Sequence, residues 1–191
     1  GQVGDILSLL EKHELTDDTL VIVTTEQGNS VPFAKWTLYD AGLQTALIAR
    51  WPGMVKPGSV TEAMVEYVDL LPTFVEAAGG EPDMSLDGRS FLPVLRGAAD
   101  THKDLVYGIQ TTRGTNDAPE CYGIRSVRSE RYKLIVNLTP EVTLTNACTT
   151  SPEFRSWVAK ATAGDADAAD KVRRYQHRPA VELYDLAVDP F

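Results

Sequence analysis

The stretch TLVIVTTEQGNSVPFAKWTLYDAGLQTALIARWPG, residues 19–53, decides the fold. Its first apolar run, at residues 20–23, is β-branched and shows no alternation, which is typical of a strand covered on both faces. A second apolar run, at residues 46–49, is closed by Trp51-Pro52-Gly53. We predict that the two runs are strands of a layered parallel sheet in a chain of α/β class.

Two polar side chains follow the first of these strands directly. Glu26 and Gln27 stand at its carboxyl end, the edge at which open α/β sheets collect ligands and metals. A carboxylate beside a side-chain amide offers the oxygen ligands that Ca²⁺ and Mg²⁺ prefer. Gly28 then allows a sharp turn, and Lys35 places a cation a few residues further on. The alternative is an ordinary turn followed by a solvated lysine.

This segment resembles the C-terminal signature of the sulfatases, which belong to the alkaline-phosphatase-like superfamily. The family pattern is Thr-Ser-Asp-Asn/His-Gly after a strand, then Gly-Lys-x-Thr-x-Tyr-Glu-Gly-Gly, then a strand ending in Trp-Pro-Gly. The corresponding segments here are TTEQG at 24–28, AKWTLYDAG at 34–42 and WPG at 51–53. The resemblance therefore implies the C-terminal part of an alkaline-phosphatase-like layered sheet.

The resemblance also implies roles for three side chains. Glu26 and Gln27 would bind the catalytic divalent ion, which is Ca²⁺ in the family, with Mg²⁺ as the alternative. Lys35 would contact the sulfate group, as both a catalytic and a substrate-binding residue. The chain departs from the family in having Glu for Asp and Gln for Asn or His, so each oxygen donor is one methylene longer.

Composition and charge narrow the classes of partner. The chain has 191 residues, of which 43% are hydrophobic and 24% charged, as in a globular protein. Its net charge of −9 argues against nonspecific nucleic-acid binding, which needs a basic surface. No apolar run approaches the roughly 20 residues that span a bilayer. We therefore predict neither a nucleic-acid nor a membrane partner, and leave open whether Cys121 and Cys148 pair.

The first half of the chain is predicted to be the C-terminal part of a catalytic α/β domain, residues 1–99. An opening helix at about 3–13 should bury a stripe that begins with Val3 and Ile6. Asp69 should cap a helix that follows it. Because the chain begins and ends abruptly, we expect it to be the C-terminal portion of a longer polypeptide, whose N-terminal part would be its partner.

Residues 100–191 are predicted to form a small α+β subdomain with an antiparallel sheet. We expect a strand at 104–110, a hairpin with arms at 122–127 and 131–138, and a last strand at 182–186. Ser151-Pro152 should open a helix, and a second helix should span about 167–176. Four cations on the hairpin should form a solvated face: Arg125, Arg128, Arg131 and Lys133.

The loop QTTRGTN at 110–116 is a candidate substrate contact. Its hydroxyls, amides and one guanidinium are groups that hydrogen-bond sugar hydroxyls and anions, and binding residues favour loops on a rigid scaffold. Within it we single out Thr112 and Arg113. The alternative is an ordinary polar loop between strands.

Later segments resemble the sulfamidase branch, whose enzymes cleave the N-sulfate of glucosamine in heparan-type chains. They are YGIRSV at 122–127, YKLIVNL at 132–138, SPEF at 151–154, ELYD at 182–185 and Asp189-Pro190. The resemblance implies a sulfated sugar or glycosaminoglycan fragment as substrate. It also implies a periplasmic, secreted or lysosomal-type location.

The family nucleophile is a formylglycine made in a Cys/Ser-x-Pro-x-Arg motif, and this sequence has no such motif. We expect it upstream, so that residues 1–191 alone are inactive. One alternative is a phosphoester or phosphonate hydrolase of the same superfamily. Another, of a different class, is a noncatalytic glycan-binding or assembly module.

Overall fold

The structure, a computed structural model, describes residues 1–189. Contacts divide the chain into two compact units, each built from separated stretches. The first unit is Gly1–Thr25 with Ala46–Val106, and the second is Glu26–Thr45 with the chain from Tyr107 onward. The predicted domain boundary at 99/100 stays a prediction. The last two residues of the chain, Pro190 and Phe191, lie outside the described residues.

The first unit holds a two-stranded sheet and several helices. Its elements are α1 (Gln2–Lys12), β1 (Val21–Thr24), β2 (Leu47–Arg50), the 3₁₀ helix η1 (Tyr67–Asp69), α3 (Leu70–Ala77) and α4 (Leu92–Leu95). No helix in the described part of the chain combines the length and apolar character that crossing a membrane requires.

The two strands of this unit are antiparallel, so the prediction of a parallel pair was wrong. Val21 lies opposite Arg50, and Thr24 lies opposite Leu47. The amide of Thr25 donates to the Ala46 carbonyl at 3.2 Å. The chain therefore enters β2 beside the carboxyl end of β1. A parallel pair would need a crossover to the far end.

Helix α1 does not bury its apolar stripe, contrary to expectation. Val3 is 47% exposed and Ile6 55% exposed, and no residue of the helix is buried. Helical spacing of apolar residues predicts a helix, but whether its stripe is covered depends on the segments around it. Within residues 1–189 the stripe is covered only in part, at Leu7 and Leu10.

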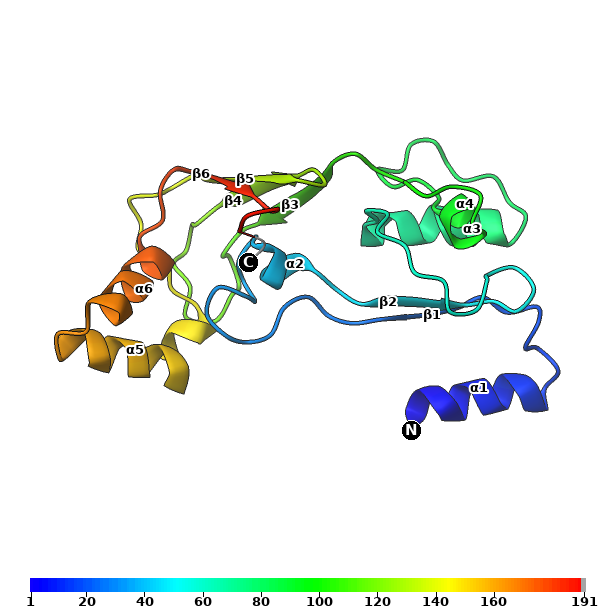
Figure 1. Cartoon of the computed structure of the whole chain (residues 1–191), viewed down its shortest axis with the longest axis horizontal. Coiled ribbons are helices and arrows are strands. Elements are labelled where there is room, and N and C mark those ends of the chain that lie inside the picture. Colours follow the sequence, from blue (N-terminus) through cyan, green and yellow to red (C-terminus); the bar gives the residue numbers. More distant parts are fainter. Residues whose placement is uncertain (190–191) are drawn as a thin grey trace. The chain divides into compact units, whose positions relative to one another are not determined.

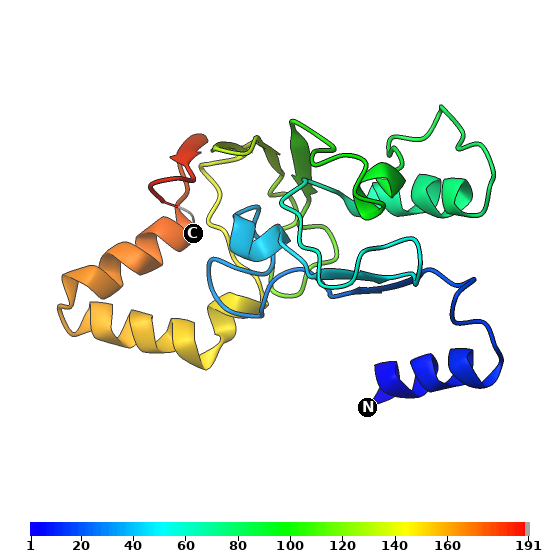
Figure 2. The ribbon, with the colours of Figure 1, turned by 45° about the vertical axis from the view of Figure 1, so that its right-hand side comes forward.

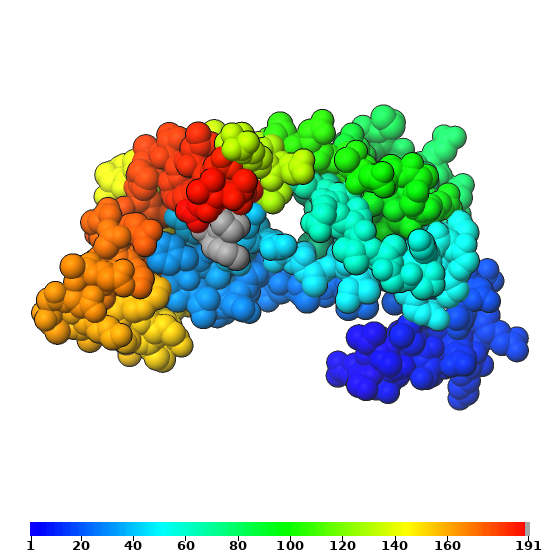
Figure 3. All heavy atoms as spheres, in the orientation of Figure 1, coloured from blue at the N-terminus to red at the C-terminus, as the bar shows by residue number. Residues whose placement is uncertain are grey.

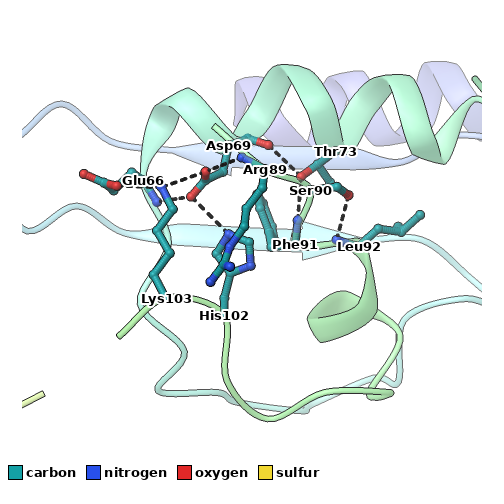
Figure 4. A network of polar contacts seen from close by, with 9 residues as sticks. All are labelled: Glu66, Asp69, Thr73, Arg89, Ser90, Phe91, Leu92, His102 and Lys103. Atoms are coloured by element: carbon teal, nitrogen blue, oxygen red, sulfur yellow. Dashed lines mark hydrogen bonds and ion pairs between the residues drawn. The ribbon is translucent and has the colours of Figure 1, made fainter. Parts of the chain in front are cut away.

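Asp69 is the centre of a buried polar network, which we call the Asp69 cluster (Figure 4). Its carboxylate accepts from the backbone N–H groups of Glu66 and Arg89, each at 2.9 Å. The Lys103 ammonium lies 2.8 Å from the carboxylate, and His102 Nε2 lies 3.3 Å from it. The predicted capping of the following helix was wrong in its target: the Asp69 side chain makes no cap hydrogen bond to α3, and instead forms a capping box with Glu66 at η1, the turn that ends at Asp69. The same carboxylate also fixes residues 89 and 102–103 against this helix start.

We predict that Gly88→Ala destabilises the chain by about 2–3 kcal/mol. A Cβ at this position would lie 1.9 Å from the Val68 carbonyl oxygen and 2.8 Å from the Asp69 amide nitrogen, so backbone would have to move. Chemical denaturation should show the loss. Gly4→Ala in α1 is the control, because a Cβ there meets nothing within 4 Å. Equal midpoints for the two variants would contradict the prediction.

The second unit is an antiparallel sheet with helices. Its elements are α2 (Asp40–Leu43), β3 (Val106–Gln110), β4 (Ile124–Arg128), β5 (Tyr132–Asn137), the 3₁₀ helix η2 (Ala147–Thr150), α5 (Pro152–Thr162), α6 (Ala166–Gln176) and β6 (Val181–Asp185). The strand order is β3–β4–β5–β6. β5 pairs antiparallel with both β4 and β6, which confirms the predicted hairpin. Helices α5 and α6 lie side by side (Figures 1 and 2).

Residues 26–45, which we call the site segment, complete the core of this unit. Leu38 is 2% exposed and packs with Tyr122, Ile124 and Ile135 of the sheet region. The Phe33 ring packs on a second cluster that includes Tyr175 of α6. In the space-filling view the site segment, in blue, adjoins the C-terminal strand, in red (Figure 3). The segment therefore depends on residues far along the chain for its position.

The hairpin cations are not all solvated, contrary to expectation. Arg128 and Lys133 are Cα partners across β4 and β5, so both reach Asp40 of the site segment. Lys133 Nζ lies 2.5 Å from Asp40 Oδ1, and Arg128 Nε lies 2.9 Å from Oδ2. Burial of Lys133 lowers its pKa, against the opposing effect of Asp40. Alternation along the hairpin predicts that its side chains point to two faces. It does not predict that Asp40 pairs with the cations on one of them.

Candidate functional site

Glu26 and Lys35 form an ion pair at the start of the second unit. Lys35 Nζ lies 2.7 Å from Glu26 Oε1. The Glu26 side chain is 71% exposed, whereas that of Lys35 is 17% exposed. The structure thus brings together two of the predicted site residues. The Glu26 side chain is open to solvent, and the Lys35 side chain beside it is mostly buried.

The backbone around Lys35 is tightly specified. Phe33 and Trp36, which flank it, both have positive φ values, 64° and 62°. The Lys35 amide donates to the Asn29 carbonyl at 3.0 Å, and the Thr37 hydroxyl donates to the backbone of the turn. Left-handed conformations at non-glycine residues cost of order 1 kcal/mol or more each and persist only where the surroundings impose them. The contacts around the turn therefore fix the backbone conformation at Lys35.

Gly28 has a clear reason to be glycine. Its φ is +60°, and a Cβ would lie 2.9 Å from the Lys35 amide nitrogen. The backbone that follows Gln27 therefore passes directly against the backbone of Lys35. This close approach keeps the oxygen donors and the lysine within one small region.

The donor chemistry at this point suits part of a site for a hard cation. Gln27 is exposed, and the second carboxylate oxygen of Glu26 is not engaged by Lys35. Both are oxygen donors of the kind that Ca²⁺ and Mg²⁺ accept. Among residues 1–189, no three His, Cys, Asp or Glu side chains are grouped to hold a metal. The two donors fit such an ion only as a partial set, which other ligands would complete.

Thr112 does not stand as a substrate contact. Its side chain is buried, and its hydroxyl accepts a hydrogen bond from the Tyr122 amide at 2.8 Å. The hydroxyl therefore fixes the loop to the segment before β4. Arg113, the next residue, is exposed, and its predicted role stays a prediction. Cys121 and Cys148 are both free thiols.

A cavity of about 990 Å³ lies within the second unit, beside the site segment. Its lining includes Asn29, Asp40 and Gln44 of the site segment, with Arg128 and Arg131 of the hairpin. Sequence reasoning missed it because three separate stretches supply its walls. Arg128 and Arg131 of the hairpin line it, although the sequence pattern predicted only a solvated face for them.

Comparison with known proteins gives consistent results. Residues 28–145 match the family described as N-sulphoglucosamine sulphohydrolase, C-terminal. An ulvan-active sulfatase of Formosa agariphila is 34% identical over 190 residues, covering 100% of this chain and 35% of the relative. The human N-sulphoglucosamine sulphohydrolase is 31% identical over 201 residues, covering 98% of this chain and 39% of the relative.

A solved structure shares the fold. It is a protein in complex with its substrate D-glucosamine-2-N,6-O-disulfate, with a TM-score of 0.67 and 23% identity. The match covers 98% of this chain and 32% of that one. The chain thus spans about a third of the length of these three proteins, from 32% to 39%. By the match over residues 28–145, it belongs to the N-sulphoglucosamine sulphohydrolase C-terminal family, and is a C-terminal portion of the sulfatase type.

Proposed function

We propose that the polypeptide carrying this chain hydrolyses a sulfate ester or sulfamate on a sulfated sugar. The observation that carries the proposal is the Lys35–Glu26 pair, held in an imposed turn that matches the sulfatase signature. The names of the relatives support sulfated sugars and glycosaminoglycan fragments as the substrate class.

Lys35 would bind the sulfate through its ammonium group. An ammonium has three N–H donors, and Glu26 engages the nitrogen from one side at 2.7 Å. The remaining donors can face sulfate oxygens, on which charge builds as the bond to sulfur breaks. Glu26 would therefore orient the lysine and also offer an oxygen to a metal ion.

Ca²⁺ is the proposed ion, with Mg²⁺ as the alternative. When bound, such an ion would neutralise charge on the sulfate and orient the nucleophile. In this chain Glu26 and Gln27 would hold it, together with ligands outside the chain. The formylglycine nucleophile is likewise proposed to lie outside residues 1–191, since the motif that generates it is absent from them.

Sulfate release tests this function directly. We expect the complete polypeptide to release sulfate, measured by ion chromatography, from N-sulfated or 6-O-sulfated glucosamine given separately. Release from the N-sulfated sugar alone would assign the sulfamidase branch, and release from the 6-O-sulfated sugar alone would assign an O-sulfatase.

A chelator should abolish release and added Ca²⁺ should restore it. Residues 1–191 alone serve as the control and should be inactive. The proposal would fail if a phosphodiester or phosphonate ester were cleaved and neither sulfated sugar were.

A further inference from the structure

Tyr39 joins the site segment to the last strand of the second unit, where the Tyr184 ring packs edge-on against the Tyr39 ring with centroids 5.8 Å apart. Tyr39, four residues after Lys35, donates its hydroxyl to Glu182 Oε2 of β6 at 2.8 Å. The Tyr39 ring packs against Phe33 on one side, with ring centroids 6.0 Å apart. The Arg178 guanidinium lies 4.4 Å from the centre of the Tyr39 ring. Tyr39 thus links the turn that holds Lys35 to the C-terminal end of the chain.

Glu182 is suited to act as a fixed anchor. It is buried, and its Oε2 also accepts the Tyr184 hydroxyl at 2.6 Å. Its Oε1 accepts from Asn137 Nδ2 at 2.7 Å, and Arg178 Nε lies 3.4 Å from the same oxygen. A buried carboxylate with this many partners has little freedom to move. The position of Glu182 therefore fixes the position of the Tyr39 hydroxyl.

The two phenols stay donors across the working pH range. Burial raises the pKa of Tyr39, and the nearby Glu182 raises it further against the effect of Arg178. Burial and the hydrogen bond to Glu182 raise the pKa of Tyr184 as well. Both hydroxyls therefore keep their protons near neutrality and can donate to Glu182.

The turn that carries Lys35 needs such an anchor. The left-handed residues Phe33 and Trp36 make it a strained turn, and strain of this kind persists only under external constraint. Phe33 packs on Tyr39, so a shift of Tyr39 would reach the residue that begins the strained turn. We propose that Glu182, acting through the Tyr39 hydroxyl, is a positioning residue for Lys35. This proposal rests on the function proposed above.

Two matched variants test the proposal. Tyr39→Phe and Tyr184→Phe each remove one hydroxyl that donates to the same oxygen of Glu182, but only Tyr39 belongs to the site segment. Both keep their rings, so both should fold, which a melting curve will check. In the complete polypeptide we expect Tyr39→Phe to lower kcat for sulfate release about tenfold, because the lost hydrogen bond to a charged group is the one that anchors the site segment. Tyr184→Phe should leave kcat within about twofold, because its lost hydrogen bond lies within β6.

Hydrogen exchange supplies a readout that does not depend on activity. The amides of Lys35, Thr37 and Gly42 are hydrogen-bonded within the site segment. They should exchange about tenfold faster in Tyr39→Phe than in Tyr184→Phe, at similar melting temperatures. Equal exchange in the two variants would overturn the proposal, whatever the enzyme does. Faster exchange without a fall in kcat would show that Tyr39 anchors the turn but would overturn the positioning role for Lys35, and the activity of the parent would leave the proposed function standing.

Discussion

Lys35→Met in the complete polypeptide is expected to lower kcat for sulfate release by about 10²–10³-fold, the usual loss when a donor to a developing oxyanion is removed. Methionine keeps much of the length and packing of the lysine stem but has no N–H to offer. Stability should hardly change, because the Lys35–Glu26 pair is half exposed and such pairs contribute little. Initial rates and a melting curve, measured on the same preparation, separate the two effects.

Lys171→Met is the matched control for that experiment. Lys171 pairs with Asp167 at 2.6 Å on the surface of α6, so its loss also breaks one exposed ion pair and removes one positive charge. This variant should keep the rate of the parent. If both variants lost activity equally, the effect would belong to net charge and not to the site. If Lys35→Met kept full turnover, Lys35 would have no part in the reaction.

Asp69→Ala is expected to destabilise the chain by about 3–5 kcal/mol, which is typical when one partner of a buried ion pair is removed. The change would leave the Lys103 ammonium without its nearest carboxylate. It would also leave the backbone N–H groups of Glu66 and Arg89 without an acceptor. Denaturant unfolding, followed by circular dichroism, measures the loss. Asp83→Ala, which removes an exposed carboxylate bonded to the Ser85 amide, should change little.

The pH dependence of that difference gives a second check. Burial would raise the pKa of Asp69, but the Lys103 ammonium and the two backbone N–H groups outweigh it and hold the pKa below 3.8. The unfolded chain therefore takes up this proton first as the pH falls. The stability that Asp69 contributes is present above pH 3.8 and is lost as the pH drops through the lower folded value. The difference in free energy of unfolding between the parent and Asp69→Ala should be constant near neutrality and should narrow below pH 3.8.

His102 adds an acid-side loss of its own in the parent. Burial lowers its pKa below 6.5, although Asp69 opposes the shift. Because the unfolded chain protonates this histidine at a higher pH than the folded one, stability declines as the pH falls below 6.5. A rise in stability over that range would contradict this assignment.

Local signals predicted local structure well. Ser151 accepts from the Phe154 amide and Pro152 begins α5, as the Ser-Pro pair indicated. The hairpin of β4 and β5 also follows from alternating residues around a short polar turn. Two kinds of prediction failed, namely the relative direction of strands and the burial of a helix face. An apolar run does not indicate whether its strand pairs parallel or antiparallel, as β1 and β2 show. Nor does helical spacing say whether a partner covers α1.

The candidate site divides in the same way. Glu26 and Lys35 are close in sequence, so motif spacing was enough to bring them together. Thr112 was misread because a loop hydroxyl looks the same in sequence whether it faces solvent or a backbone amide. The bond between Tyr39 and Glu182 joins residues 143 positions apart. No local pattern at either residue signals its partner.

That separation sets an order of events during synthesis. The lysine turn is made early, but the carboxylate that anchors it leaves the ribosome 143 residues later. At the usual pace of translation this delay is on the order of 10 s. In that interval the turn has its local hydrogen bonds but not its distant anchor. A nascent chain interrupted before β6 would thus carry every predicted site residue and still lack the contact that we propose positions Lys35.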